Sequence, residues 1–121
     1  MDDPAKFPRI FAIPFGNVHE AYANKVERKG RTIGEVDEAI RWLTGYTQRG
    51  LEGHVAKGTG LGTFFAKAPR MNPDRSLVKG VVCGVRVEDI KDPTMQAIRC
   101  MDKLVDEIAK GKPMEKVLRK A

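Results

Sequence analysis

One stretch of the chain decides the fold: residues 92–109 read DPTMQAIRCMDKLVDEIA. Asp92 can accept hydrogen bonds from the first free amides of a helix, and Pro93 fits the first helical turn. Apolar side chains then recur at steps of three and four residues, at Ile98, Met101, Val105 and Ile108. This spacing predicts a long amphipathic helix whose apolar stripe packs into the protein core, with pairing to a second copy of the chain as the alternative.

Capping boxes toward the N-terminus predict two further helices. In such a box, a polar residue at the helix start and an acid three positions later bond each other's backbone amides. Asn17 and Glu20 have this spacing. Thr32 and Glu35 form a second box with the preferred threonine. Because a glycine that can end a helix follows each apolar pattern, we expect helices over 17–29 and 32–44.

Shorter helices are expected on either side of the middle of the chain. Thr47 can cap a helix that reaches Gly58, which is weaker because two glycines lie inside it. Leu61–Lys67 reads as a short helical turn that ends before a proline. Residues 112–121 are predicted to form a basic helical end, with a last amphipathic turn or two that starts at Pro113.

The segment 78–87 supports two interpretations. Asn72 and Pro73 form a good helix start, so we expect a helix that ends near Cys83, followed by extended chain at Val85–Val87. The same segment is rich in β-branched valines and contains two glycines, which leaves a short strand as the alternative.

Within the N-terminal residues 1–16, the stretch Phe7–Phe15 is apolar but interrupted by Pro8 and Pro14. We therefore expect an extended segment that lies over the helices, with an edge strand inside it as the alternative. No linker or repeat divides the chain. The sequence predicts a mainly α protein, one domain over 1–121, built as a compact bundle of about five helices.

Length and composition indicate a globular protein that needs no disulfides. The chain has 121 residues, of which 41% are hydrophobic and 31% charged, within the ordinary range for a folded domain. Its opening residues Met1–Pro4 are acidic, unlike the basic start of a signal peptide, and Val81–Val85 is too short to cross a bilayer. We therefore expect a cytoplasmic protein without membrane contact, in which Cys83 and Cys100 are reduced and partly buried.

Positive charge is concentrated in the second half of the chain. The net charge of +6 divides into +1 for residues 1–60, with 9 basic and 8 acidic residues, and +5 for residues 61–121, with 13 and 8. Such a basic end can contact a nucleic-acid backbone. It can equally be a solvated helix end whose cations suit the helix dipole, and the lack of interleaved aromatic residues favours this simpler interpretation.

No stretch of the sequence predicts catalysis, a metal or a cofactor. Gly58–Thr63 lacks both the preceding strand and the Lys-Ser/Thr ending of a phosphate-binding loop. Zinc sites bring their ligands in close pairs, whereas the histidines and cysteines here are scattered, at His19, His54, Cys83 and Cys100. We expect no catalytic residue, no metal ligand and no cofactor, and we lean against an enzyme.

Eight residues are the candidates for contact with a partner. Trp42 and Tyr46 most simply anchor a corner of the core, but a half-exposed pair would mark a protein-binding patch. The other candidates are basic side chains that could meet a partner or a phosphate backbone. They are Arg49, Arg86, Lys112, Lys116, Arg119 and Lys120.

The sequence also resembles a family of small bacterial proteins catalogued as a domain of unknown function (number 2200). The resemblance covers nearly the whole chain, from Arg9 to Lys120, and departs from the family near Asp2–Pro4 and Gly58–Gly62. It implies a free-standing bacterial cytoplasmic protein and supplies no catalytic or ligand-binding residue. The residues that carry it are Arg28–Thr32, Glu35–Asp37, Trp42–Tyr46, Asn72–Pro73, Lys79–Asp89, Asp92–Pro93, Asp102–Leu104, Lys110–Lys112 and Met114–Lys116.

Three functions remain open from the sequence. The first is a non-enzymatic protein-interaction module, either for an unknown partner protein or for self-association as a homodimer through the stripe at 98–108. The second is a nucleic-acid-binding protein that uses the basic second half. The third is a small-ligand-binding protein or enzyme with a site around Arg86, Glu88 and Asp89 or near Trp42 and Tyr46.

Overall fold

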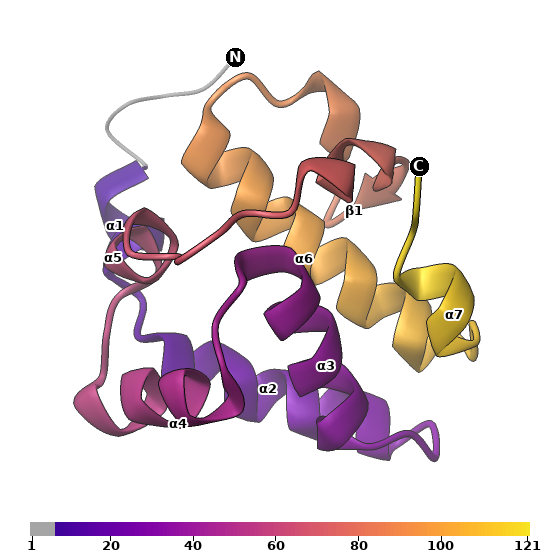
Figure 1. Ribbon diagram of the computed structural model, residues 1–121, viewed down its shortest axis with the longest axis horizontal. Coiled ribbons are helices and arrows are strands. Elements are labelled where there is room, and N and C mark those ends of the chain that lie inside the picture. The colour runs from indigo at the N-terminus through magenta and orange to yellow at the C-terminus, as the bar shows by residue number, and fades with distance from the viewer. Residues whose placement is uncertain (1–6) are drawn as a thin grey trace.

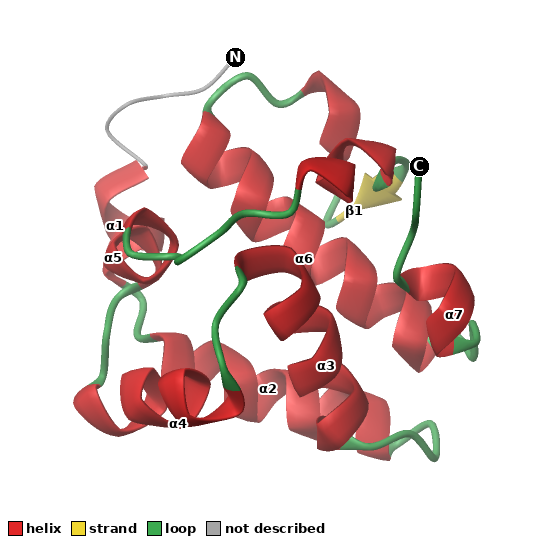
Figure 2. Cartoon of the chain, viewed as in Figure 1, coloured by secondary structure: helices red, strands yellow, loops and turns green. Residues whose placement is uncertain are grey.

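A computed structural model describes residues 7–121, which fold as a mainly helical domain around one long helix (Figures 1 and 2). Seven α-helices, two 3₁₀ turns and one small hairpin occur within these residues. The elements are α1 Phe7–Ala12, α2 Phe15–Glu27, α3 Ile33–Thr44, α4 Gln48–Lys57, α5 Leu61–Ala66, η1 Pro73–Leu77, β1 Val81–Val82, β2 Val85–Arg86, η2 Val87–Asp89, α6 Pro93–Ala109 and α7 Met114–Val117.

Helix α6 is the centre of the fold, as the sequence predicts. Asp92 caps it by accepting a hydrogen bond from the Met95 amide at 2.8 Å. Its apolar stripe packs against α2, α3 and α5, and the stripe residues between Ile98 and Ile108 are at most 3% exposed. Because the core covers this stripe, it is not a surface through which two copies of the chain could pair.

Helix α3 has both predicted ends. The Thr32 hydroxyl accepts from the Glu35 amide, and the Glu35 carboxylate accepts from the Thr32 amide, so the predicted capping box is present. Gly45 ends the helix in the left-handed conformation. The predicted helix from Thr47 to Gly58 is also confirmed as α4, with the Thr47 hydroxyl accepting from the Gly50 amide at 3.0 Å.

Helix α2 begins two residues before the predicted cap at Asn17. Pro14 precedes it in an extended conformation, and no side chain caps its start. Phe15 is fully buried, with its ring stacked on Phe64 at a centroid distance of 4.0 Å. Its amide donates to the Thr59 carbonyl at 2.7 Å. Core packing and this bond therefore replace the predicted capping box.

The expectation of an extended N-terminal segment is wrong for residues 7–12, which form α1, while residues 1–6 lie outside the described part. Helix α1 packs against α5, and the glycine-rich stretch before and within α5 permits their close approach. A Cβ at Gly60 would lie 2.7 Å from the Phe11 carbonyl oxygen, and one at Gly62 would lie 2.8 Å from the Phe11 Cβ. These glycines therefore serve helix packing.

The predicted helix over 72–83 is wrong. Asn72 caps only the short 3₁₀ turn η1, after which β1 and β2 form an antiparallel hairpin that contains the strand expected near Val85. Cys83 and Gly84 both have positive φ, 52° and 77°, which is the conformation required by a two-residue hairpin turn. The turn exposes Cys83, whereas Cys100 is buried as expected, and burial raises its pKa to about 11.

No helix within residues 7–121 is long and apolar enough to cross a membrane.

Candidate functional site

The C-terminal end of α3 is held by the segment that leads into η1. The last carbonyls of a helix have no partner inside the helix. Here the Arg70 amide donates to the Thr44 carbonyl at 3.0 Å, and the Asn72 amide donates to the Leu43 carbonyl at 2.9 Å. The Asn72 side-chain amide donates to the Trp42 carbonyl at 3.2 Å. Three terminal carbonyls are therefore bonded by one segment, which fixes the backbone from Trp42 to Thr44.

Gly45 makes this close approach possible. Its φ is 79°, a conformation that side chains disfavour, and a Cβ at this position would lie 2.8 Å from the Arg70 carbonyl oxygen. The Asn72 side chain also accepts from the Asp74 amide at 2.8 Å, which sets the start of η1. The glycine and the asparagine together build a rigid frame out of two segments that are far apart in the sequence.

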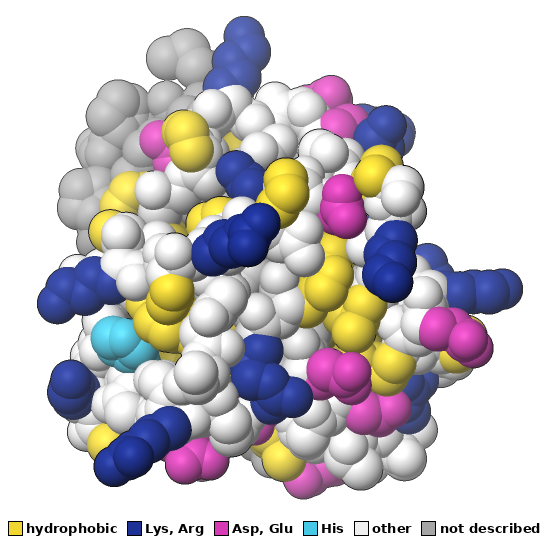
Figure 3. Space-filling model, in the orientation of Figure 1, with side chains coloured by type: hydrophobic (Ala, Val, Ile, Leu, Met, Phe, Trp, Pro, Cys, Tyr) yellow, Lys and Arg dark blue, Asp and Glu magenta, His cyan; other side chains and the backbone are white. Residues whose placement is uncertain are grey.

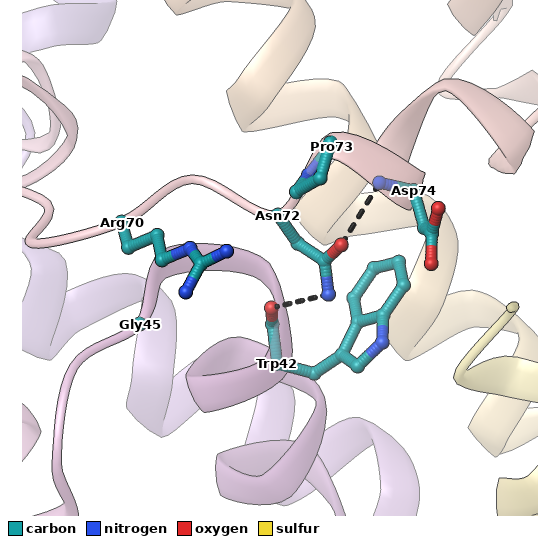
Figure 4. A pocket seen from close by; sticks show the side chains of 6 residues that line it. All are labelled: Trp42, Gly45, Arg70, Asn72, Pro73 and Asp74. Carbon is teal, nitrogen blue, oxygen red and sulfur yellow. Dashed lines mark hydrogen bonds between the residues drawn. The ribbon is translucent and has the colours of Figure 1, made fainter.

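A cleft of about 470 Å³ opens at this frame (Figure 4). Arg70 extends on one side of Asn72, and the Trp42 ring and the Asp74 carboxylate lie on the other side. The Trp42 side chain is partly buried against the core and partly exposed to the cleft. The lining residues are Trp42, Gly45, Arg70, Asn72, Pro73 and Asp74, and this set is called the Trp42 cleft below.

Three polar groups that line the Trp42 cleft are not used by the fold. Among residues 7–121, neither the Arg70 guanidinium, the Asp74 carboxylate nor the Trp42 indole N–H forms a hydrogen bond or ion pair. A guanidinium can hold a carboxylate through two parallel hydrogen bonds, and an indole face offers a large apolar contact. The cleft is lined by neither imidazole nor thiol. Its chemistry is therefore suited to holding a ligand.

Tyr46, the second aromatic candidate, belongs to the core. Its side chain is 8% exposed, and its hydroxyl donates to the Phe64 carbonyl at 2.6 Å. Burial raises the pKa of this phenol. The sequence interpretation of an aromatic core anchor is therefore right for Tyr46, and the half-exposed position is that of Trp42 alone.

The two basic candidates nearest the middle of the chain lie outside the Trp42 cleft. Arg49 is exposed in the first turn of α4. The Arg86 side chain is 55% exposed on β2 and approaches the Glu88 carboxylate at 3.8 Å. The Gly80 amide donates to Glu88 at 2.9 Å, and this bond lowers the pKa of Glu88. Glu88 thus ties the ends of the hairpin together.

The four C-terminal candidates divide into paired and free cations. Arg119 donates two bonds of 2.6 Å each to the Glu107 carboxylate, which is 5% exposed. Lys112 approaches the same carboxylate at 3.4 Å. Lys116 and Lys120 are exposed, and their ammonium groups bond no side chain among residues 7–121. The helix itself ends at Val117, before the predicted limit of 121.

A polar cluster that sequence reasoning missed joins α2, α3 and α4. Asp37 is 7% exposed; one carboxylate oxygen contacts His19 Nε2 at 2.6 Å, and the other accepts from Gln48 at 2.8 Å. Burial alone would raise the pKa of Asp37, but the bonds from His19 and Gln48 and the charges of His19 and Arg41 outweigh it, so the pKa is lowered. Arg41 also donates to Gln48.

One signal could have revealed this cluster. Asp37 lies on the apolar side of its helix, between Ile33 and Ile40, where an acid must find partners. An apolar groove of about 280 Å³ lies beside it, lined in part by Leu51 and Val55. No group of three or more metal-binding side chains gathers here or elsewhere in residues 7–121.

Comparison with known proteins places the chain in a family. The family model described as an uncharacterized protein conserved in bacteria, domain of unknown function 2200, matches residues 9–119. The chain belongs to this family. In this member, the family domain is helical and is built around α6. The resemblance seen in the sequence is therefore confirmed.

A solved structure supports the same fold for this member of the family. It is a crystal structure described as "uncharacterized protein SP1917", with 42% sequence identity, a TM-score of 0.86, and coverage of 91% of this chain and 90% of that chain. None of the curated proteins compared with the chain matches it.

Proposed function

We propose that this member of the family is a cytoplasmic, non-enzymatic protein-interaction module that holds a segment of a partner protein in the Trp42 cleft. The observation that carries the proposal is the partly exposed Trp42 indole on a rigid frame beside an unpaired Arg70 guanidinium. Tryptophan and arginine are the residues most enriched among those that dominate the energy of protein interfaces.

The rigidity of the frame supports binding. Three carbonyls at the end of α3 are bonded to the segment 70–72, so the two walls of the cleft are held before any partner arrives. A preorganised site avoids the entropy cost of ordering its own loops on binding. The cleft volume of about 470 Å³ also falls within the usual range of ligand sites, ~300–1,000 Å³.

The lining residues suggest the chemistry of the partner segment. Arg70 would pair with a carboxylate of the partner, while the Trp42 ring would cover an apolar side chain. Asp74, on the far side of Asn72, can accept a hydrogen bond from a backbone amide of the same segment. An extended peptide with an acidic residue close to a large apolar residue meets all three requirements.

A second copy of this chain is one partner to consider. The apolar stripe of α6 is buried, so self-association would have to use an exposed surface such as the Trp42 cleft. Sedimentation of the purified protein and of Trp42→Ala over a range of concentrations tests this form of the proposal. A wild-type dimer that dissociates in the variant would identify the partner as a second copy.

Intrinsic fluorescence offers a direct test because Trp42 is the only tryptophan of the chain. Peptides selected from a random library on the immobilised protein would be titrated while the Trp42 emission is recorded. We expect enrichment of peptides with an acid near an aromatic or aliphatic residue, and a shift of the emission on binding.

Arg70→Ala and the matched control Lys91→Ala decide the result. Both side chains are exposed cations, but Lys91 is outside the cleft. We expect Arg70→Ala to weaken binding by about tenfold or more, equal to about 1.4 kcal/mol, and Lys91→Ala to leave it unchanged. Selected peptides that bind both variants as tightly as the wild type, with no change in Trp42 emission, would refute the proposal.

A further inference from the structure

We propose that the hollow between the end of α6 and α7 is a second binding site, for an anion that carries several phosphate groups. The hollow measures about 460 Å³. Four lysines and one carboxylate line it together with a glycine and a proline: Lys103, Lys110, Lys112, Lys116, Glu107, Gly111 and Pro113. This set is called the lysine hollow below.

Chain geometry explains why these lysines meet. Lys103 and Lys110 are seven positions apart, so they lie on one side of α6 and its C-cap. Gly111 then turns the chain with a φ of 94°, which brings Lys112 and the short helix α7 back over the same side. Lys116 lies in that helix. The lysines thus come from three consecutive elements around one concavity.

Glu107 is the one carboxylate among residues 7–121 that lines the hollow, and it is already neutralised. Arg119 bonds both oxygens of Glu107 at 2.6 Å, and Lys112 lies 3.4 Å from one of them. Arg119 therefore serves to hold Glu107 and is not available to a ligand. With the charge of Glu107 balanced by Arg119, the four lysines give the lining of the hollow a net positive charge.

The lysine ammonium groups keep hydrogen-bond donors for a ligand. Lys110 pairs with Asp106 at 3.0 Å, but its side chain is 73% exposed, and exposed ion pairs are weak. Lys103 uses one of its three N–H groups on the Val81 carbonyl at 3.3 Å. Lys116 bonds no side chain within residues 7–121. An incoming anion therefore needs to displace little.

The lining also indicates the class of anion. Lysine acts toward phosphate as a point charge with several donors, so several lysines around one hollow favour an anion with several phosphate groups. No aromatic side chain from the described part of the chain lines the hollow, so a base would have no ring on which to stack. Recognition would therefore be of the phosphate groups, whether they belong to a free polyphosphate or to a nucleic-acid backbone.

This site is independent of the Trp42 cleft, because the two share no lining residue. The probe for the test is inorganic tripolyphosphate, titrated at low salt and followed by calorimetry and by the backbone amide signals in NMR. Binding in the lysine hollow predicts that the Gly111 amide signal moves with the titration. The amide of Gly58, which lies at the end of α4, serves as the reference and should stay in place.

Matched variants separate a built site from net charge. Lys110→Gln/Lys112→Gln/Lys116→Gln removes three cations from the hollow, and a control triple variant removes three exposed cations elsewhere, at Lys57, Lys67 and Lys91. We expect the hollow variant to weaken tripolyphosphate binding by about tenfold or more and the control by less than about threefold. Equal losses in both variants, or no binding to the wild type, would overturn the proposal.

Two further arms complete the test. Lys116→Gln alone leaves every described ion pair in place, so its loss of affinity would not be attributable to misfolding. A single-stranded oligonucleotide added as a competitor identifies the source of the phosphate. Displacement of tripolyphosphate, with an affinity that falls steeply as salt rises, would indicate a nucleic-acid backbone, and its absence would indicate a free polyphosphate.

Discussion

Asp37 and Trp42 lie on the same helix, little more than one turn apart, and their polar groups behave in opposite ways. Both oxygens of Asp37 are bonded, to His19 and Gln48, so its charge joins three helices. The Trp42 indole N–H and the side chains of Arg70 and Asp74, by contrast, form no hydrogen bond or ion pair within residues 7–121 and line a cleft. The difference separates the groups that stabilise the fold from those that a partner could use.

The charged C-terminal region shows the same contrast between paired and free groups. Glu107 is buried with Arg119, as Asp37 is with its partners, while Lys116 is as free as Arg70. Arg70 and Arg119 look alike in the sequence, but burial and pairing give them different roles. Substitutions in the paired groups should change stability, and substitutions in the free groups should change binding. Figure 3 shows Lys and Arg side chains scattered over one face of the molecule, among acidic and hydrophobic side chains.

The largest expected effect is on stability, from Arg119→Ala. It leaves the buried Glu107 carboxylate without its main partner, and removal of one member of a buried ion pair costs about 3–5 kcal/mol. Urea unfolding at neutral pH measures this loss. Lys120→Ala is the control, because Lys120 is exposed, and it should leave the free energy of unfolding unchanged. Equal stability of the two variants would break the distinction between paired and free cations.

Gly45→Ala should destabilise the protein by about 2–3 kcal/mol. The left-handed conformation alone costs a side chain about 1–2 kcal/mol, and the new Cβ would also meet the Arg70 backbone. Gly53→Ala is the matched control, because a Cβ there meets nothing within 4 Å. Thermal melts of both variants check this prediction. A Gly45→Ala melt like that of the wild type would show that the frame of the Trp42 cleft yields easily.

Asp37→Asn should cost about 1.5–2 kcal/mol at neutral pH, since it weakens hydrogen bonds to a charged acceptor. Because the pKa of Asp37 is lower in the folded chain, its stabilising effect is fully present above the unfolded value of about 4 and is lost as pH falls through the folded value. The difference between wild type and variant should therefore shrink in acid. Urea unfolding of both proteins at several pH values tests this. A difference that persists undiminished in strong acid would contradict a role for the Asp37 charge.

Much of the fold could be predicted from local signals in the sequence. The caps at Thr32 and Asp92 and the stop at Gly45 act within a few residues, so each could be recognised from its own neighbourhood. The Asn17 box failed because a contact distant in the sequence, Phe15 on Phe64, decides where α2 begins.

The hairpin at 81–86 was the ambiguous case, and the turn decided it. Helix periodicity and β-branching compete there, and the left-handed pair Cys83 and Gly84 closes a two-residue turn that a helix does not permit.

The candidate site could be predicted only in part. Trp42 was identifiable as a candidate, although the sequence favoured a core anchor for it, whereas its neighbours Arg70 and Asp74 come from a distant segment that only tertiary packing brings to it.

The central claim is that the Arg70 side chain in the Trp42 cleft contributes to binding a partner and not to the stability of the fold. Arg70→Ala tests it most directly, through its free energy of unfolding and its affinity for a library-selected peptide, both read from the Trp42 emission. We predict that stability stays within about 0.5 kcal/mol of the wild type while affinity falls by about tenfold or more. A loss of stability with unchanged affinity would contradict the claim.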